Sequence, residues 1–515
     1  MDPELNPSTA STTSNSQMYQ AVQDHKLEDI KLLLENGKDV NEPIITTGEF
    51  AGFTALHVAC MDTGHNDYEV VDLLVNKCKA DVNVMAADGT QPIHLACFYE
   101  TPDGALEDRF KQFVSFKITI LVKANANVNT EFGQEVFSKH VKDMKWCPDF
   151  GDKMPLVAYT IIYDKPSIIF HLKKINVDII SLTNKTLLMY AVENECYAHI
   201  SIIMSNVEDP ELMDKLINHR DNDDVPLTHY PFHPKKYGKF RYHYMTMFAD
   251  LYMNPTFIFD LSSWGADMYA LINNDPATFL PNLSAYKSCP MLLEYSLPYY
   301  TSMSLSKVLY YATLPIDERP EHSVCYDTEV QRNNYLAQIR ENREDCIAIA
   351  LKDLVFRVAF RLPVPEGEIK LMDELIASDG NLREIANDYK INFIEKELKD
   401  HFIEFDDNKM TMYDFLMQVF DDKKLKFLAR KENLLHALDE VFNLTSDDYS
   451  FYESYYNPIK NRIKDAKERL RLLEKLKKIS SLRKAIPLPF EVVLEIVGNL
   501  NNKHLNVFIK AFYTS

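Results

Sequence analysis

Two histidines, His57 and His94, are the first candidates for chemistry, because an imidazole can bind a metal ion or transfer a proton near neutral pH. They lie thirty-seven positions apart, in the matching stretches 52–60 and 89–97. Each stretch begins with Gly and ends in the order apolar, His, apolar, Ala, Cys. A histidine repeated in a fixed context indicates a repeated structural unit more than a single metal or catalytic site.

Three further histidines, His229, His233 and His243, lie in or beside the segment 230–244, which is dense in His, Tyr, Lys and Pro. Such a group could hold a metal ion. No carboxylate or cysteine accompanies these histidines at ligand spacing. We therefore interpret the segment as an aromatic loop at the edge of a structural unit, and we predict no metal site.

The other residues with chemical potential are cysteines. The chain has eight, scattered, without a CxxC pair and without a histidine at ligand spacing, which is typical of reduced structural thiols inside a cell. Cys325 and Cys346 are therefore expected to be structural rather than nucleophilic. The sequence also lacks a Gly-rich nucleotide loop, an HExxH motif and a GxSxG motif. It predicts that the chain is not an enzyme and binds no cofactor.

Charge and hydropathy narrow the function classes further. The formal net charge of −20 argues against a nucleic-acid binder and fits a protein that meets protein partners. No stretch supplies the ~18 consecutive apolar residues of a membrane span. Residues 1–17 are polar and lack the apolar run of a signal peptide. We therefore expect a soluble, cytoplasmic protein with a flexible leader over these residues, and the nucleus is the alternative location.

A second block recurs after each histidine-containing stretch. Ala-Asp-Val-Asn at 80–83 is matched by Ala-Asn-Val-Asn at 126–129, with an earlier copy at 37–41 and a later one at 265–268. A glycine or asparagine normally stands where the preceding helix ends in a left-handed turn, and Lys79 departs from that pattern. Two matched blocks per unit predict a helical repeat.

The two blocks resemble the consensus of the ankyrin repeat, a helix pair that stacks into a solenoid. The resemblance implies that His57 and His94 bridge neighbouring turns by hydrogen bonds. We predict about six to seven repeats over residues 18–300, the later ones degenerate. In an ankyrin array a target protein is expected at the hairpin tips between repeats and on the concave inner face. The repeat register places at those tips Glu49, Phe50, Phe53, Asp88 and Thr90.

From residue 301 the character of the chain changes. Residues 301–456 are predicted to be helical, either as divergent repeats or as a separate helical bundle. Residues 457–485 form a basic helix with an amphipathic stripe. Such a helix could be a nuclear localisation signal, a surface for an acidic partner or a solvated connecting helix, and we favour the connecting helix.

The last thirty residues, 486–515, carry the second strong pattern. They begin with Leu488 and Pro489, continue with Glu491 and an apolar helix, and then turn into a second helix. This order resembles the beginning of an F-box. The apolar stripe is wide for so short a segment to bury, which favours a helix that docks in the groove of a partner. The alternative is a helix that caps the preceding bundle.

Ankyrin repeats followed by a truncated F-box resemble the PRANC family of poxviruses, intracellular bacteria and parasitoid wasps. The resemblance implies docking on the Skp adaptor of a cullin-RING ubiquitin ligase, while the repeats capture a host protein for ubiquitylation or sequestration. The positions that match the motif, and that would contact the adaptor, are Leu488, Pro489, Glu491, Val492, Ile496 and Leu500. The alternative is an ankyrin scaffold that masks a signalling protein without recruiting a ligase. The predicted fold is all-α: an ankyrin solenoid, a helical region and an F-box-like end.

Overall fold

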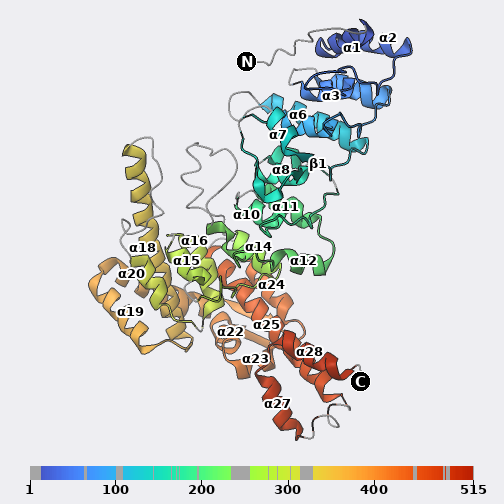
Figure 1. Ribbon diagram of the computed structural model, residues 1–515. Helices are drawn as coiled ribbons and strands as arrows, with labels where there is room; N and C mark the ends of the chain where they lie inside the picture. The colour runs from blue at the N-terminus through green and yellow to red at the C-terminus, as the bar shows by residue number, and fades with distance from the viewer. Residues whose placement is uncertain are drawn as a thin grey trace. The chain divides into compact units, whose positions relative to one another are not determined.

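The computed structural model describes most of the 515-residue chain. The described residues are 13–62, 67–99, 108–142, 144–163, 165–169, 171–172, 174–193, 197–232, 256–275, 278–286, 288–301, 303–313, 329–406, 408–444, 449–479, 482, 486 and 488–513. They form two compact units, the first up to residue 232 and the second from residue 256 onward. Both units are built almost entirely of helices, so the fold is all-α, as the sequence predicts (Figure 1).

The first unit is a series of stacked helix pairs (Figure 1). The first helices of the pairs are α1 (Thr13–Gln23), α3 (Ala55–Met61), α5 (Pro92–Phe98), α8 (Leu156–Ile162) and α10 (Leu187–Glu193). The second helices are α2 (Leu27–Glu35), α4 (Asp67–Asp72) with its π-helical continuation η1 (Leu73–Lys77), α6 (Asp108–Lys123), α9 (Pro166–Ile169) and α11 (Tyr197–Ser205). The second helices contact one another from α4 through α6 and α9 to α11. This is the stacking of an ankyrin solenoid.

The ends of the first unit differ in part from the expected boundaries. Helix α1 begins at Thr13, and Asn15 within it is buried. The flexible leader predicted for residues 1–17 is therefore wrong from Thr13 onward, because this polar stretch begins the first helix of the first repeat. Residues 1–12 lie outside the described residues. At its other end the described part of the unit finishes with α12 (Pro210–Ile217) and the 3-10 helix η3 (Leu227–Phe232).

Left-handed residues follow the second helices at corresponding positions. The φ angle is +91° at Gly37, +59° at Lys79, +67° at Asn125 and +57° at Lys174. Lys79 makes the same turn as the glycine, in spite of the steric cost of a Cβ in that region. Lys174 marks a further turn that the sequence patterns missed, because neither Gly nor Asn stands there.

Asparagines after these turns connect one repeat to the next. A backbone N–H of the following repeat donates to each side-chain oxygen: Asp81 to Asn41 (2.8 Å), Asn127 to Asn83 (2.7 Å) and Asn176 to Asn129 (2.6 Å). We call this series the asparagine ladder. Because each bond spans one repeat, the recurring Val-Asn ending connects repeats as well as marking a turn.

The hairpin before α8 contains an insertion. Strand β1 (Glu131–Gly133) pairs antiparallel with β2 (Lys153–Pro155). Between the two strands lie the helix α7 (Gln134–His140) and the short 3-10 helix η2 (Pro148–Phe150). The sequence patterns missed this insertion, because it carries neither of the two repeat blocks.

The second unit contains the helices from α14 to α28 (Figure 1). Its helices are α14 (Thr256–Ser263), α15 (Leu280–Tyr286), α16 (Pro290–Ser296), η5 (Leu297–Tyr300), α17 (Ser306–Thr313), α18 (Glu329–Ala359), α19 (Glu366–Ser378), α20 (Gly380–Asp388), η8 (Tyr389–Glu397), α21 (Leu398–Asp400), α22 (Met412–Val419), α23 (Asp422–Leu428), α24 (Leu434–Leu444), α25 (Tyr449–Lys477), α27 (Phe490–Gly498) and α28 (Asn502–Tyr513). An antiparallel hairpin of β3 (Phe402–Phe405) and β4 (Asn408–Thr411) precedes α22. Helices α14 and α16 contact α25, so residues 256–300, which the sequence assigns to the repeats, group with the later helices.

Helix α25 is the central helix of the second unit, which corrects the prediction of a solvated connecting helix at 457–485. It contacts α14, α16, α22, α23, α24 and α28. Its apolar stripe is buried at Ile459, Ile463, Leu472 and Leu476. The high density of basic residues favoured a solvated helix, whereas the amphipathic stripe that accompanies them in the sequence marks a face that is core.

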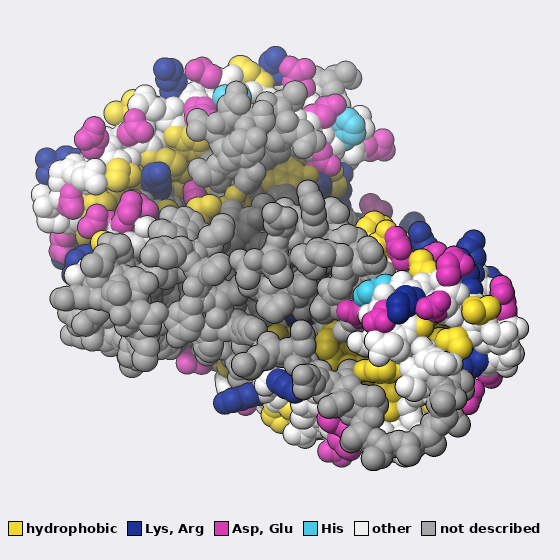
Figure 2. All heavy atoms as spheres, turned by 90° about the horizontal axis from the view of Figure 1, so that it is seen from above, with side chains coloured by type: hydrophobic (Ala, Val, Ile, Leu, Met, Phe, Trp, Pro, Cys, Tyr) yellow, Lys and Arg dark blue, Asp and Glu magenta, His cyan; other side chains and the backbone are white. Residues whose placement is uncertain are grey.

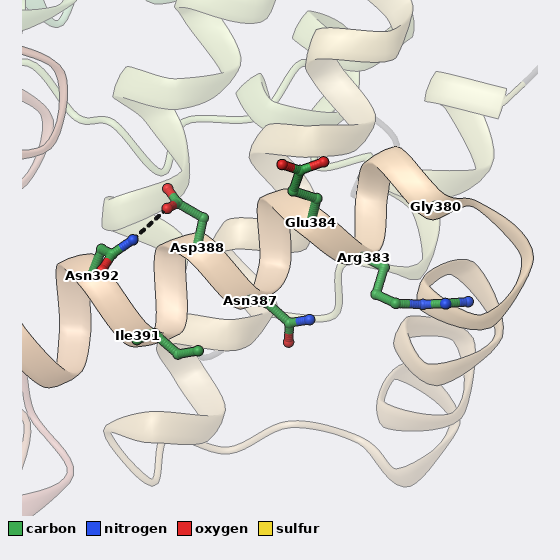
Figure 3. A pocket seen from close by; sticks show the side chains of 7 residues that line it. All are labelled: Gly380, Arg383, Glu384, Asn387, Asp388, Ile391 and Asn392. Atoms are coloured by element: carbon green, nitrogen blue, oxygen red, sulfur yellow. Dashed lines mark hydrogen bonds between the residues drawn. The ribbon is translucent and has the colours of Figure 1, made fainter.

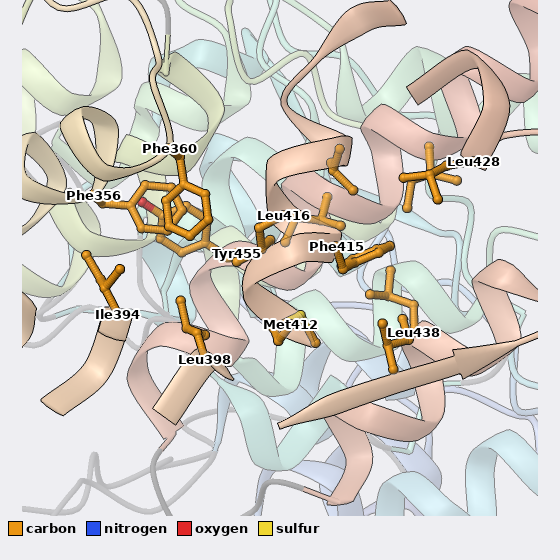
Figure 4. Close-up of a cluster of buried hydrophobic side chains, with 14 of the residues drawn as sticks. Phe356, Phe360, Ile394, Leu398, Met412, Phe415, Leu416, Leu428, Leu438 and Tyr455 are labelled. Carbon is orange, nitrogen blue, oxygen red and sulfur yellow. The ribbon is translucent and has the colours of Figure 1, made fainter. Parts of the chain in front are cut away.

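A core cluster of the second unit joins α18 to α25 (Figure 4). The ring of Phe356 packs on those of Phe360 and Tyr455, with centroids 4.4 and 4.7 Å apart. The Tyr455 hydroxyl also donates to Oδ1 of Asp353 (3.1 Å). The second carboxylate oxygen of Asp353 lies 2.6 Å from Nε of Arg357, and both side chains are almost fully buried. The core therefore encloses an ion pair.

Candidate interaction surfaces

Helix α27 presents one apolar face to solvent and buries the other. Leu488, just before the helix, is 46% exposed, Val492 is 37% exposed and Ile496 is 54% exposed. The spacing of four residues places Val492 and Ile496 on one side of the helix. We call these two residues, together with Leu488 before the helix, the exposed α27 face. Val493 and Val497 are only 4% and 0% exposed. One half of the apolar stripe seen in the sequence is therefore exposed, and the other half is buried.

The other positions expected to contact an adaptor divide in the same way. Pro489 and Glu491 are exposed at the start of α27. Leu500 is half-buried and packs against the small core at this end of the chain. The first two residues are accessible to a partner, whereas Leu500 contributes mainly to the folding of this end.

That small core lies between α25, α27 and α28. Val493 and Val497 pack there with Leu476 of α25 and Leu505 of α28. Burial of these apolar side chains fixes α27 to the rest of the second unit. The buried half of the stripe accounts for a capping role, and the exposed half remains available for a partner.

Basic side chains of α25 bind carbonyl oxygens at the ends of other helices. Arg469 donates to the carbonyls of Val497 (2.6 Å) and Leu500 (2.6 Å), where α27 ends. Arg462 donates to the carbonyl of Val419 (2.9 Å), where α22 ends. The negative end of a helix dipole favours a cation at this place. Part of the basic character of α25 therefore serves internal contacts and needs no acidic partner or nuclear import receptor to explain it.

Three of the five residues placed at the ankyrin hairpin tips are accessible. Glu49 is exposed, and Phe50 and Asp88 are half-buried. Phe53 and Thr90 are 0% exposed, so their side chains cannot contact a target in this structure. The prediction was wrong for these two because both lie at the contact between neighbouring repeats.

His57 forms that contact. Its Nδ1 accepts a bond from the N–H of Thr54 (3.2 Å), so Nε2 carries the proton and donates to the carbonyl of Thr90 in the next repeat (3.1 Å). Its ring stacks on that of Phe53, with centroids 5.0 Å apart. Burial lowers the pKa of His57 to about 4, so the ring is neutral at pH 7. The bridging role expected from the ankyrin resemblance is confirmed for His57.

His94 repeats only half of this arrangement. Its Nδ1 accepts a bond from the N–H of Gln91 (3.1 Å). Its Nε2 is buried and has no hydrogen-bond partner among the residues that the structure describes. The bridge expected at His94 is therefore wrong. The next hairpin, where the bridging acceptor would stand, is the one interrupted by α7.

Lys139 of α7 reaches back to two earlier hairpins. Its Nζ donates to Oδ2 of Asp88 (2.8 Å) and to the carbonyl of Glu49, and it lies 4.5 Å from the ring centroid of Phe50. Burial raises the pKa of Asp88, but bonds from Lys139 and Thr90 outweigh burial and leave that pKa below its ordinary value. The chain itself thus contacts the accessible hairpin tips. Sequence reasoning missed Lys139, because it lies 51 positions from Asp88 in an insertion without a repeat signal.

The pocket on helices α20 and η8 does not gather catalytic groups (Figure 3). It is lined by Gly380, Arg383, Glu384, Asn387, Asp388, Ile391 and Asn392. All seven belong to one continuous helical segment, and the side chain of Asn392 donates to that of Asp388 one turn away (2.6 Å). This is the side of a helix and offers no second wall of reactive groups.

The remaining sequence candidates for chemistry are structural where they are described. His229 is buried, with Nδ1 3.0 Å from the Thr228 hydroxyl, and Cys346 is buried. His233, His243 and Cys325 lie outside the described residues. Within the described ranges, no three His, Cys, Asp or Glu side chains are placed to share a metal ion.

The face of the molecule in Figure 2 and the hydropathy of the described helices bear on two other kinds of partner, a charged surface and a membrane. On the face in Figure 2, Lys and Arg side chains are interspersed with Asp and Glu. None of the helices in the described ranges combines the length and the apolar character needed to cross a membrane.

Comparison with known proteins identifies the repeats. Residues 18–107 match a family model described as ankyrin repeats, in three copies. Among solved structures the chain is similar to an ankyrin repeat protein from Leishmania major, with 15% identity and a TM-score of 0.31, over 65% of this chain and 98% of that one. No curated protein matches the chain. Ankyrin repeats form a non-enzymatic scaffold for protein–protein interaction.

Proposed function

Since residues 18–107 are ankyrin repeats, we propose that the chain is a substrate receptor. It binds a host target protein through its repeats and docks on the Skp adaptor of a cullin-RING ubiquitin ligase through α27. The chemistry then belongs to the recruited ligase, and the chain needs no catalytic group of its own. The choice of adaptor rests on the F-box-like order of the last thirty residues and on their resemblance to the PRANC family.

The exposed α27 face is the observation that supports docking. Leu488, Val492 and Ile496 are apolar and open to solvent, and an amphipathic helix with such a face is a common ligand for a hydrophobic groove. The small core beneath the helix holds it in place through Val493 and Val497. A preformed helix loses little conformational freedom on binding, which favours affinity.

The target surface is proposed at the accessible hairpin tips. Glu49, Phe50 and Asp88 come from two neighbouring hairpins, and Lys139 joins them through its bonds and its position over the Phe50 ring. The Lys139 side chain is only 8% exposed, so a target protein contacts Glu49, Phe50 and Asp88 and not Lys139 itself.

A pull-down with purified Skp adaptor tests the docking. The full chain should retain the adaptor, whereas Leu488→Ala/Pro489→Ala and Val492→Asp/Ile496→Asp should both lose it, because they remove or charge apolar side chains of the exposed α27 face. Phe427→Asp is the matched control, since Phe427 is an apolar residue of α23 that is 67% exposed. Circular dichroism confirms that each variant is folded. Adaptor retention by both double variants would refute docking through α27.

The second candidate function is an ankyrin scaffold that masks a signalling protein without a ligase. The burial of Val493 and Val497 favours it, because a helix that only caps the second unit would bury the same side chains. Val492→Asp/Ile496→Asp separates the two functions, because it charges the exposed α27 face and leaves the buried Val493 and Val497 in place. Loss of cullin recovery with unchanged thermal unfolding supports docking, and no cullin recovery by the folded wild-type chain supports masking without a ligase.

A further inference from the structure

Helix α27 is attached to the second unit by few contacts. The backbone of α28 packs along α25, whereas no described helix approaches the backbone of α27 as closely. In the small core α27 buries Val493 and Val497, and its partly buried Phe490 and Leu494 pack against the same core. A charged side chain, Arg469, bonds the end of the helix. Arg469 therefore adds directional hydrogen bonds to this apolar packing.

Arg469 binds the C-terminal end of α27 with both arms of its guanidinium. Nη1 donates to the carbonyl of Leu500 (2.6 Å), and Nη2 donates to those of Val497 (2.6 Å) and Gly498 (3.3 Å). The last carbonyls of a helix lack intrahelical donors and carry the negative end of its dipole. A planar guanidinium can bond several of them in fixed directions, whereas an ammonium is a point donor.

We propose that Arg469 is a positioning residue for the adaptor, which sets the direction of the exposed α27 face without touching the partner. This inference rests on the proposed docking function. The carbonyls that Arg469 binds begin directly after Ile496, the last residue of that face. Without this contact α27 samples several orientations, and only the fraction with the correct one can bind.

Binding kinetics with purified Skp adaptor distinguish positioning from contact. Arg469→Gln should lower the association rate constant on the order of tenfold and leave the dissociation rate constant unchanged, because fewer chains are competent. Ile496→Ala removes a contact and should instead raise the dissociation rate constant. Arg469→Lys keeps one charged donor and should fall between Arg469→Gln and the wild type. Arg471→Gln is the matched control, since Arg471 pairs with Glu468 on the same helix (2.5 Å) and should show wild-type rates.

Amide exchange of the unbound chain provides the second readout. Arg469→Gln should speed exchange over residues 490–500 and leave α18 and α24 protected as in the wild type. Faster exchange throughout the second unit would overturn the inference, because Arg469 would then stabilise the whole unit and not only the orientation of α27.

Three kinetic outcomes separate the possible failures. A wild-type association rate in Arg469→Gln overturns the positioning role. A raised dissociation rate in that variant also overturns it, because Arg469 would then contact the adaptor. If the wild-type chain does not bind the adaptor at all, the proposed docking fails, and the inference fails with it.

Discussion

Nε2 of His57 lies 3.1 Å from the carbonyl oxygen of Thr90, thirty-three positions further along the chain, and joins two ankyrin repeats by a buried hydrogen bond. His94 occupies the same place in the next repeat, but its Nε2 has no such partner among the described residues. Both rings are fully buried, and both accept a backbone N–H at Nδ1. The two histidines are therefore a matched pair that differs in the bridging bond.

His57→Ala should destabilise the chain more than His94→Ala. Both substitutions remove a buried ring and its bond at Nδ1, but only His57→Ala also removes the bond to the Thr90 carbonyl, which keeps the N–H of Ala86 (2.9 Å) as its other donor. The difference in the free energy of unfolding should be about 1 kcal/mol, the net value of one hydrogen bond. Amide exchange of α3 and α5 in increasing urea measures it. Equal losses in the two variants would show that the bridge contributes nothing.

The first unit should lose stability as the pH falls below 6.5. Burial lowers the pKa of His57 to about 4, of His94 to about 3 and of His140 to about 4, from an ordinary value of 6.5. Between pH 6.5 and about 4 the unfolded chain binds protons that the folded chain does not. Stability that is complete above pH 6.5 is therefore lost toward pH 4, by about 3 kcal/mol for each histidine. Urea unfolding at several pH values measures the slope.

His140→Phe should make that slope shallower, because phenylalanine fills a similar space among the aromatic rings and does not titrate. His436→Gln is the control and should leave the slope unchanged, since the side chain of His436 is 75% exposed. A His140→Phe variant with the wild-type slope would mean that the buried histidines do not govern acid stability.

Lys139→Met should destabilise the first unit by about 1–3 kcal/mol, the usual contribution of a hydrogen bond to a charged group. The substitution keeps an apolar stem but leaves the half-buried Asp88 without its ammonium partner, so the pKa of Asp88 should rise. Denaturant unfolding gives the stability, and amide exchange over residues 44–53 reports the loss of the bond to Glu49. Lys153→Met, at an exposed position of β2, is the control. Unchanged stability and exchange in Lys139→Met would show that Lys139 of α7 does not stabilise the two earlier hairpins.

Arg357→Met should cost about 3–5 kcal/mol, because it leaves the carboxylate of Asp353 buried without a counter-ion. Arg357 also donates to the backbone carbonyls of Tyr300 (3.2 Å) and Met303. The double variant Asp353→Leu/Arg357→Met should recover much of the lost stability, since two apolar side chains need no counter-ion. Urea unfolding of the wild type, the single variant and the double variant measures these differences in stability. A double variant as unstable as the single one would show that the carboxylate is not the source of the loss.

Features that recur along the chain could be predicted from the sequence, and features that occur once could not. The ankyrin fold, the bridge at His57 and the turn at Gly37 follow from blocks that repeat at a regular spacing. The insertion with Lys139 occurs once, and its contacts to earlier hairpins depend on the folded path of the chain. Lys174 makes the same turn as Gly37 with a residue type that carries no turn signal.

The prediction was also wrong for α25, where many basic residues and a buried apolar face lie on the same helix. Helix α25 is dense in cations, yet Arg462 and Arg469 face the ends of neighbouring helices and Ile463 is core. For α27 the sequence predicts the apolar stripe but not its division. Which half is buried depends on where α25 and α28 lie. In the structure Val493 is buried and Val492 is exposed.

The affinity of the full-length chain for purified Skp adaptor is the central measurement, and isothermal titration calorimetry gives it directly. The account predicts a one-to-one complex, weakened by at least about tenfold in Val492→Asp/Ile496→Asp and unchanged in Phe427→Asp, because buried apolar anchors dominate such interfaces. A folded wild-type chain that gives no binding heat and no complex on gel filtration would contradict docking on the adaptor.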